Sequence, residues 1–217
     1  MKRHFRLTAA FLALLAGPTW AGEQSYSVSL AGRQLGTLTF NGHSRNAAFL
    51  LALDNAPFGI KNGTFSAVTQ AQGDQVSYLG TNRGSETRDI DITRSAGQVT
   101  SVAVAPPSER TEISEAAKVP AGVIFPPELF AALATAETCP APLAAYDGRR
   151  VVQIAPEAVQ REGDRERCDM SYRVVMGPGY VAPFYLKSFG MELVYTARTL
   201  ARASISGGGF TVHLNRQ

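Results

Sequence analysis

Two aspartates separated by a single residue, Asp89 and Asp91, lie in a segment that alternates polar and apolar positions. Side chains two residues apart point to the same face of a β-strand, so the two carboxylates are expected to lie side by side. Such a pair can hold a divalent ion or act as acid and base in hydrolysis. Arg88 and Arg94 flank the pair, and a solvated strand face with ordinary ion pairs is the favoured interpretation.

The histidines beyond the N-terminal segment are His43 and His213. His43 follows Asn41-Gly42, a dipeptide typical of tight turns, and His213 lies on the polar face of the last expected strand. Both are expected to be surface residues rather than catalytic bases. The chain also lacks the G-x-S-x-G elbow, the P-loop, the HExxH motif and the EF-hand loop. The sequence therefore assigns no catalytic residue, no cofactor and no metal ligand.

Two cysteines, Cys139 and Cys168, are present in the chain. In an exported protein such a pair usually forms a disulfide, which here would close a loop of roughly 30 residues and contribute about 3.5 kcal/mol. A metal pair or two free thiols are the alternatives. A metal pair needs further ligands, and neither histidine is close in sequence. The spacing is not CxxC, which disfavours redox catalysis.

Export is predicted from residues 1–21. A basic start is followed by an eleven-residue apolar run from Leu7 to Gly17, and Thr19-Trp20-Ala21 then offers small residues at the two positions read by a signal peptidase. The run is too short for a membrane span, so a cleavable signal peptide and a periplasmic mature chain from about Gly22 are expected. A buried N-terminal helix is the alternative. No later segment has the length of a transmembrane helix.

The charge balance changes with this cleavage. The full chain has 21 basic and 18 acidic residues, and removal of Lys2, Arg3 and Arg6 leaves 18 of each. A formally neutral chain argues against a nucleic-acid binder, which usually carries a basic surface. The remaining 217 − 21 = 196 residues suit one domain, residues 22–217.

Most of the mature chain alternates with a period of two, which is typical of antiparallel strands with one buried face. Residues 26–30 and 36–40 predict a hairpin, and the apolar run 48–53 predicts a well-buried strand, with a helical segment as its alternative. Pro126 and Pro127 open a short helix ending near Ala136. The expected fold is mainly β: a curved antiparallel sheet forming an open barrel or sandwich, with one short helix.

A curved sheet must bury its concave face by closing, by packing under the helix, or by holding an apolar ligand. The helix is expected to cap the open end of the sheet, and a movable lid is the alternative. An ordinary core is favoured over a ligand-lined cavity. The candidate lining residues are Phe40, Phe65, Tyr172, Met176 and Tyr195.

Several short motifs carry a family resemblance. They are the N-terminal hairpin, Tyr146-Asp147-Gly148-Arg149-Arg150 after Cys139, Cys168-x-x-x-Tyr172-Arg173, and Met176-Gly177-Pro178-Gly179-Tyr180. In these the chain resembles exported bacterial proteins catalogued as a domain of unknown function, number thirty-one-oh-eight. The resemblance implies an exported, mostly β protein with no established catalytic residues. Arg149 and Arg150 are expected to pair with carboxylates across their turn, and contact with an anion or a partner is the alternative.

Three functions follow from these features. The first is a non-enzymatic periplasmic binding or envelope-maintenance protein that holds a lipid or other apolar small molecule on its concave sheet. The second is a structural protein that pairs with another envelope protein through a strand edge. The third, ranked last because no site is assembled, is an enzyme that acts on envelope polymers through Asp89, Asp91 or Glu192.

Overall fold

The computed structural model describes residues 22–56, 61–84, 86–180 and 185–217, and the expected signal peptide lies outside them. Strands dominate the described chain. They are β1 (Gln24–Leu30), β2 (Arg33–His43), β3 (Asn46–Leu53), β4 (Gly63–Gln72), β5 (Gln75–Arg83), β6 (Thr87–Ser95), β7 (Gln98–Ala105), β8 (Leu143–Tyr146), β9 (Val151–Glu162), β10 (Arg165–Met176), β11 (Ser188–Thr196), β12 (Thr199–Gly207) and β13 (Phe210–Arg216).

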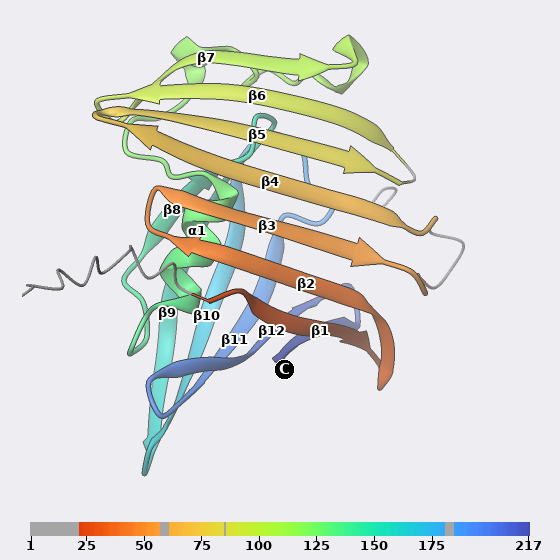
Figure 1. Ribbon diagram of the computed structural model, residues 1–217, viewed down its shortest axis with the longest axis vertical. Coiled ribbons are helices and arrows are strands. Elements are labelled where there is room, and N and C mark those ends of the chain that lie inside the picture. Colours follow the sequence, from red (N-terminus) through yellow and green to blue (C-terminus); the bar gives the residue numbers. More distant parts are fainter. Residues whose placement is uncertain (1–21, 57–60, 85, 181–184) are drawn as a thin grey trace, which may run out of the picture.

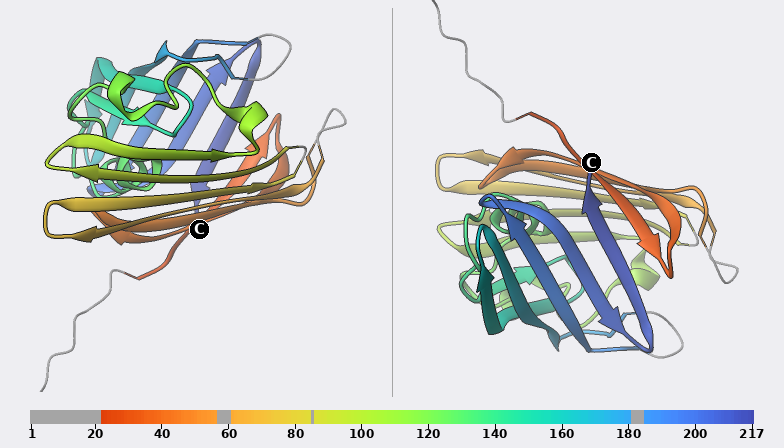
Figure 2. Two further views of the ribbon diagram at one scale, coloured as in Figure 1. Left: turned by 90° about the horizontal axis from the view of Figure 1, so that it is seen from above. Right: turned by 90° about the horizontal axis from the view of Figure 1, so that it is seen from below.

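All thirteen strands form one antiparallel sheet with the order β7-β6-β5-β4-β3-β2-β1-β13-β12-β11-β10-β9-β8. The pairing of β1 with β13 joins two arms, which we call the N-terminal arm (β1–β7) and the C-terminal arm (β8–β13). The arms bend toward each other, and β7 and β8 are the two edge strands of the described sheet, with β8 bridged on its outer side by Ile124 (Figures 1 and 2). The predicted curved antiparallel sheet is therefore confirmed, and it is open.

Helix α1 (Pro126–Ala134) lies between the two arms (Figure 2). Within the described residues it is the only α-helix, and no helix there is long and apolar enough to cross a membrane. The connector of residues 106–125 leads to it through two short 3-10 turns, Pro107–Glu109 and Ala116–Lys118. The connector bonds to both arms: Gly122 N–H donates to the Gly97 carbonyl beside β7, and Ile124 N–H donates to Ala144 in β8.

A buried ion pair fixes α1 to the N-terminal arm. The guanidinium of Arg94 in β6 donates to both carboxylate oxygens of Glu128, at 2.9 and 2.7 Å, and to the Val123 carbonyl at 2.6 Å. Glu128 also accepts the N–H of Phe125, the residue before the helix, at 2.7 Å. This bond satisfies one of the backbone N–H groups that have no partner within the helix. A carboxylate in the first helical turn is favoured at this place for that reason.

The main core packs beneath α1. The ring of Phe130 lies 5.5 Å from that of Tyr26 and 5.0 Å from that of Phe40, so the helix covers the inner face of β1 and β2. At the far end of the helix, Tyr195 of β11 donates its hydroxyl to the Leu133 carbonyl at 2.9 Å. The helix is thus held by both arms, and it fills the junction between them.

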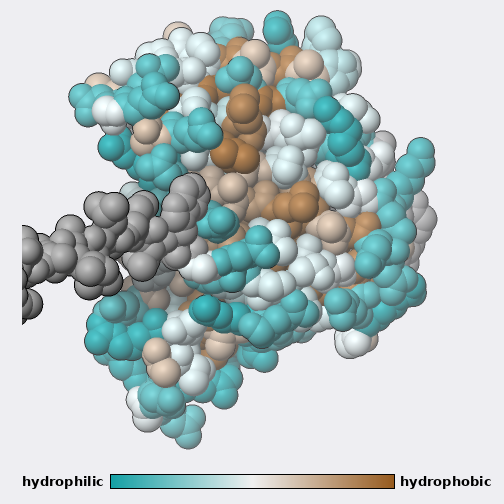
Figure 3. Space-filling view, viewed as in Figure 1, coloured by the Kyte–Doolittle hydropathy of each residue, from teal (hydrophilic) through white to brown (hydrophobic). Residues whose placement is uncertain are grey.

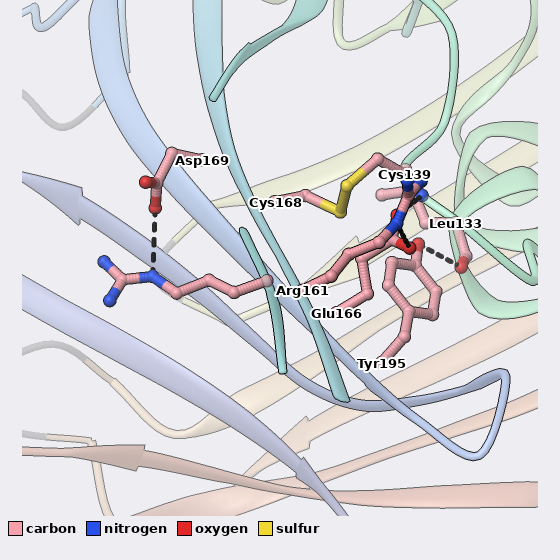
Figure 4. The surroundings of a disulfide bond; sticks show 8 residues. Leu133, Cys139, Arg161, Glu166, Cys168, Asp169 and Tyr195 are labelled. Atoms are coloured by element: carbon pink, nitrogen blue, oxygen red, sulfur yellow. Dashed lines mark hydrogen bonds and ion pairs between the residues drawn. A yellow bond between two sulfur atoms is a disulfide. The ribbon is translucent and has the colours of Figure 1, made fainter. Parts of the chain in front are cut away.

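The predicted disulfide is confirmed. Cys139, which follows α1, is bonded to the fully buried Cys168 in β10, with 5.6 Å between the Cα atoms (Figure 4). Glu166 accepts the Cys139 N–H and the Nε–H of Arg161, both at 2.7 Å. The bridge therefore ties the segment after the helix to the middle of the C-terminal arm.

Two local predictions are wrong. Asn41-Gly42 does not form the turn: both residues pair inside β2 with β3, and the chain turns at Ser44–Arg45. Gly42 is required for another reason, since its φ is +108° and a Cβ there would lie 2.2 Å from the Asn46 carbonyl oxygen. The second error concerns the run 48–53, which forms strand β3 but is only half-buried.

The exposure in β3 has a simple cause. Its outward-facing residues have no second layer of structure over them, and Leu50 is 43% exposed. A continuous apolar run predicts burial on both faces only where both faces are covered.

Candidate functional site

A cavity of about 480 Å³ lies between the two arms. β4, β5 and β6 form one wall and β8, β9 and β10 form the other, with the start of α1 between them (Figures 1 and 2). The segment just after β10 completes the lining through Pro178, Gly179 and Tyr180. The two arms form strand pairs with each other only where β1 meets β13, and the cavity lies between their more distant strands.

Part of the wall is apolar. Phe65 of β4 and Ile90 of β6 face Ala145 of β8 and Val152 of β9, and Leu129 of α1 closes the side between them. These residues lie on inward-facing positions, where alternation places the apolar half of each strand. This part of the cavity can accept an apolar group.

The remaining wall carries three arginines: Arg88 of β6, and Arg149 and Arg150 between β8 and β9. Arg88 and Arg149 share one partner, Glu109 of the connector. Arg88 Nε donates to Glu109 Oε2 at 2.7 Å, and Arg149 donates to the Glu109 carbonyl at 2.6 Å. Burial and the nearby Arg88 charge lower the pKa of Arg149, although Glu109 opposes that effect.

A tight turn presents the two neighbouring arginines. Asp147 Oδ1 accepts the backbone N–H groups of Arg149 and Arg150, both at 2.9 Å, which is the turn that Asp-Gly predicts. Gly148 has a φ of +94°, and a Cβ there would lie 2.8 Å from Ile90. The turn therefore presses against the opposite arm, and only glycine fits at its tip.

Four tyrosines, two buried and two half-buried, surround the arginines. The side chains of Tyr78, Tyr146, Tyr172 and Tyr180 all line the cavity. Tyr146 donates to the Ile113 carbonyl at 2.7 Å, and the hydroxyls of Tyr172 and Tyr180 share one bond of 2.7 Å. The Tyr78 hydroxyl has no hydrogen-bond partner among the described residues.

Burial is the main cause of raised pKa values in this group. It raises the pKa of Tyr172 to about 12, and it raises the pKa values of Tyr78 and Tyr180 well above the usual range. The Asp147 carboxylate raises all three further. These hydroxyls therefore keep their protons at neutral pH and are available as hydrogen-bond donors.

We expect these tyrosines to make the protein sensitive to alkali. Unfolded tyrosines titrate near pH 10, and the folded protein holds the same protons more tightly, so the free energy of unfolding should fall as the pH rises above about 10. Urea unfolding measured from about pH 8 to about pH 11, together with tyrosinate absorbance, checks this. A stability that is unchanged over that range would contradict the burial of these rings.

The predicted lining residues fall into two groups. Phe65 and Tyr172 line this cavity, whereas Phe40 and Tyr195 lie in the packed core beneath α1, and Met176 packs against the core of the N-terminal arm. Binding of a ligand by any of them stays a prediction. Arg149 and Arg150 lie 3.3 Å from carboxylate oxygens of Glu109 and Asp147, and both line the cavity. Their contact with an anion or a partner stays a prediction.

Three lining tyrosines were not predicted as candidate site residues: Tyr78, Tyr146 and Tyr180. Tyr78 follows the inward alternation of β5, and Tyr146 begins the Asp-Gly-Arg-Arg motif. A tyrosine on an inward position needs a partner for its hydroxyl, and this requirement is the signal that could have marked them.

The candidate catalytic residues are not brought together. Asp89 and Asp91 are exposed on the outer face of β6, and Asp89 pairs with Arg83 at 2.7 Å. The flanking Arg88 and Arg94 point to the opposite, inner face, because they share the parity of Ile90 and Ile92.

Glu192 and the two histidines do not join the candidate aspartates in a common site. Glu192 lies between Arg167 and Arg202 at 2.8 and 2.7 Å. His43 is exposed, as expected. His213 is half-buried and its Nδ1 lies 2.9 Å from Ser204 Oγ, which forms a pair across β12 and β13. These contacts fit ion-pair and hydrogen-bond ladders on the outside of the sheet.

One group has the composition of a metal site. The ligand atoms of Cys139, Glu166 and Cys168 lie within 4.8 Å of one another. Cysteine binds zinc as a free thiolate, and here the two sulfurs are joined in a disulfide. This group is therefore part of the structural bridge.

Comparisons with known proteins assign no family to the chain. No protein-family model matches the chain, and no curated protein matches it either. A solved structure of a beta-barrel-like protein of a domain of unknown function, DUF1849, from Brucella abortus is similar, with a TM-score of 0.49 and 12% sequence identity. The similarity covers 90% of this chain and 95% of that chain. The motif resemblance to family thirty-one-oh-eight receives no support from these comparisons.

Proposed function

We propose that this chain is a non-enzymatic periplasmic binding protein that holds one small molecule with an apolar part in the cavity between its two arms. The observation that carries the proposal is the cavity itself: about 480 Å³, with an apolar wall beside a wall of arginines and tyrosines. This volume lies within the range of small-molecule sites, about 300–1,000 Å³. Export and the relation to family thirty-one-oh-eight belong to the proposal and rest on sequence motifs.

The rest of the fold supports a carrier better than an enzyme. The candidate carboxylates Asp89, Asp91 and Glu192 are on the outside of the sheet, away from the cavity. The cavity is held in shape by α1, the connector and the Asp147 turn, so it is preformed rather than assembled by the ligand. A preformed site reduces the ordering that binding requires.

Binding of the neutral apolar dye N-phenyl-1-naphthylamine tests the proposal. We expect saturable binding of one dye per chain, because the apolar wall excludes water from the dye. Replacing Leu129 by Trp adds bulk beside the cavity and should abolish the fluorescence of the bound dye. The dye is excited at a wavelength that tryptophan does not absorb. Leu50→Trp, on the exposed face of β3, is the matched control and should bind normally. Equal binding by both variants would place the dye elsewhere and contradict the proposal.

A second candidate function is a partner-binding envelope protein. Apolar side chains gather on the outer face of the N-terminal arm, where Leu50 and Leu79 are 43% and 54% exposed (Figure 3). Exposed apolar patches often mark interaction surfaces. Crosslinking at position 79 in intact cells tests this function: a single specific adduct would support it, and the absence of any adduct would count against it.

A further inference from the structure

Arg150 makes weaker polar contacts than its burial requires. Its side chain is 7% exposed, yet its Nε lies 3.3 Å from Asp147 Oδ2 without the alignment of a hydrogen bond, and its Nη1 donates to the Gly179 carbonyl at 3.4 Å. The face of the Tyr180 ring lies 3.9 Å from the guanidinium carbon. An arginine carries five N–H donors, and a buried cation needs most of them satisfied.

Arg94 provides the comparison within the same protein. It is buried to the same extent, with 8% of its side chain exposed, and it makes three bonds of 2.6 to 2.9 Å to Glu128 and Val123. Arg94 thus has a bidentate carboxylate partner and a backbone carbonyl at short distances, as expected of a structural arginine. Arg150 lines the cavity and lacks such a set among the described residues.

Unused hydroxyl donors share the cavity wall with Arg150. The Tyr78 hydroxyl is fully buried and has no partner among the described residues. Tyr172 and Tyr180 share a single bond between their hydroxyls, so one of the two hydrogens remains available. Burial keeps all three hydroxyls protonated.

The nearest acceptor is already occupied. Asp147 Oδ1 receives two backbone N–H groups at the turn, and Oδ2 faces Arg150. Glu109 is occupied in the same way by Arg88 and Arg149. Glu86, the other carboxylate of the lining, pairs with Arg88. Each of these carboxylates therefore already faces an arginine, while donors of Arg150 and Tyr78 have no such partner, and a ligand that completes this wall must bring oxygen acceptors.

We propose that the cavity recognises a single-chain amphiphile by its anionic oxygen head group, which Arg150 and the Tyr78 hydroxyl bind while the apolar tail lies against Phe65, Ile90 and Leu129. A carboxylate and a phosphate share the required chemistry. This inference rests on the proposed function, because it names the class of ligand for the same cavity.

Four twelve-carbon probes and two tailless anions test the proposal by isothermal titration calorimetry. The probes are dodecanoate, dodecyl phosphate, dodecanol and dodecyltrimethylammonium, each below its micelle concentration, and the tailless anions are acetate and inorganic phosphate. The protein is the mature chain freed of bound lipid on a hydrophobic resin. We expect at least one anionic probe to bind about tenfold more tightly than dodecanol, since charged hydrogen bonds exceed neutral ones by that order.

Two variants assign the effect to the named groups. Arg150→Gln should weaken the anionic probe about tenfold and dodecanol less than about twofold. Tyr78→Phe should weaken the anionic probe several-fold while leaving the unfolding temperature of the ligand-free protein unchanged or higher, because it removes a hydroxyl without a partner. Tyr146→Phe, whose hydroxyl donates to Ile113, is the matched control and should lower that temperature.

The possible outcomes distinguish failure of the head-group assignment from failure of the proposed binding function. Equal binding of dodecanol and the anionic probes, or tighter binding of the cationic probe, overturns the head-group assignment and leaves a cavity for apolar ligands. Equally tight binding of acetate or inorganic phosphate shows an anion site without a tail site, which also overturns it. Failure of all four probes overturns the proposed function itself.

Discussion

Replacing Glu128 by Gln is expected to lower the free energy of unfolding by about 3–5 kcal/mol, the cost of leaving one partner of a buried ion pair alone. Both side chains are buried, with 8% of Arg94 and 5% of Glu128 exposed, so water can stabilise the unpaired guanidinium charge only weakly. The amide retains the shape of the carboxylate but not its charge. The Arg94 guanidinium, which also lies 4.9 Å from the centre of the Phe125 ring, is then buried without a counter-ion.

Urea unfolding followed by far-ultraviolet circular dichroism measures this loss. Asp89→Asn is the matched control, because it removes the carboxylate of an exposed pair with Arg83 and should cost no more than about 1 kcal/mol. The double variant Arg94→Met/Glu128→Leu should recover part of the loss, since two apolar side chains replace two charges. A Glu128→Gln variant as stable as Asp89→Asn would show that the pair does not hold α1 to the sheet.

Removing the disulfide should have an effect of similar size. Replacing Cys139 and Cys168 together by Ala is expected to lower the free energy of unfolding by about 3.5 kcal/mol, because the 29-residue separation leaves a large loop free in the unfolded chain. Cys168 is a fully buried residue of β10, so alanine also leaves a small void. The segment after α1 would then keep two polar contacts with the C-terminal arm: the backbone N–H of residue 139 with Glu166, and the ion pair of Glu137 with Arg198.

The unmodified protein provides the control for this variant. Unfolded in the presence of dithiothreitol, it should reach the same stability as the double alanine variant, which itself should not respond to the reductant. A loss of less than about 1 kcal/mol would mean that the bridge does not restrict the unfolded chain as the loop model requires.

The strands and the helix could be predicted because their signals are local. Alternation places Tyr26 and Ile90 on buried faces, and Pro126-Pro127-Glu128 marks the helix start that the structure shows. Asn41-Gly42 misled the prediction because glycine is also required where strands approach closely, which depends on the partner strand.

The cavity could not be predicted from local patterns. Its walls come from β4 to β6 and from β8 to β10, which are brought opposite each other only because β1 pairs with β13. That pairing joins residues about 190 positions apart in the chain, and nothing in the alternation of either strand specifies it. The same alternation describes Phe65, which lines the cavity, and Phe40, which is core.

For Arg149 and Arg150, the sequence motif predicts the turn but not the partners of the side chains. The Asp-Gly turn predicts that both arginines follow a tight bend, and the structure shows Asp147 holding their backbone N–H groups. Whether such arginines meet carboxylates or a ligand depends on what the opposite arm supplies. Glu109 supplies the partner of Arg149, while Arg150 faces tyrosines.

Native mass spectrometry of the protein purified from periplasm, compared with the same sample after denaturation, tests the central claim most directly. We expect an excess mass of one small molecule that disappears on denaturation, is acidic on extraction, and is absent from the Leu129→Trp variant. A bare mass in the native sample, with the protein two hydrogens lighter than the reduced chain, would confirm the disulfide and contradict a ligand held between the arms.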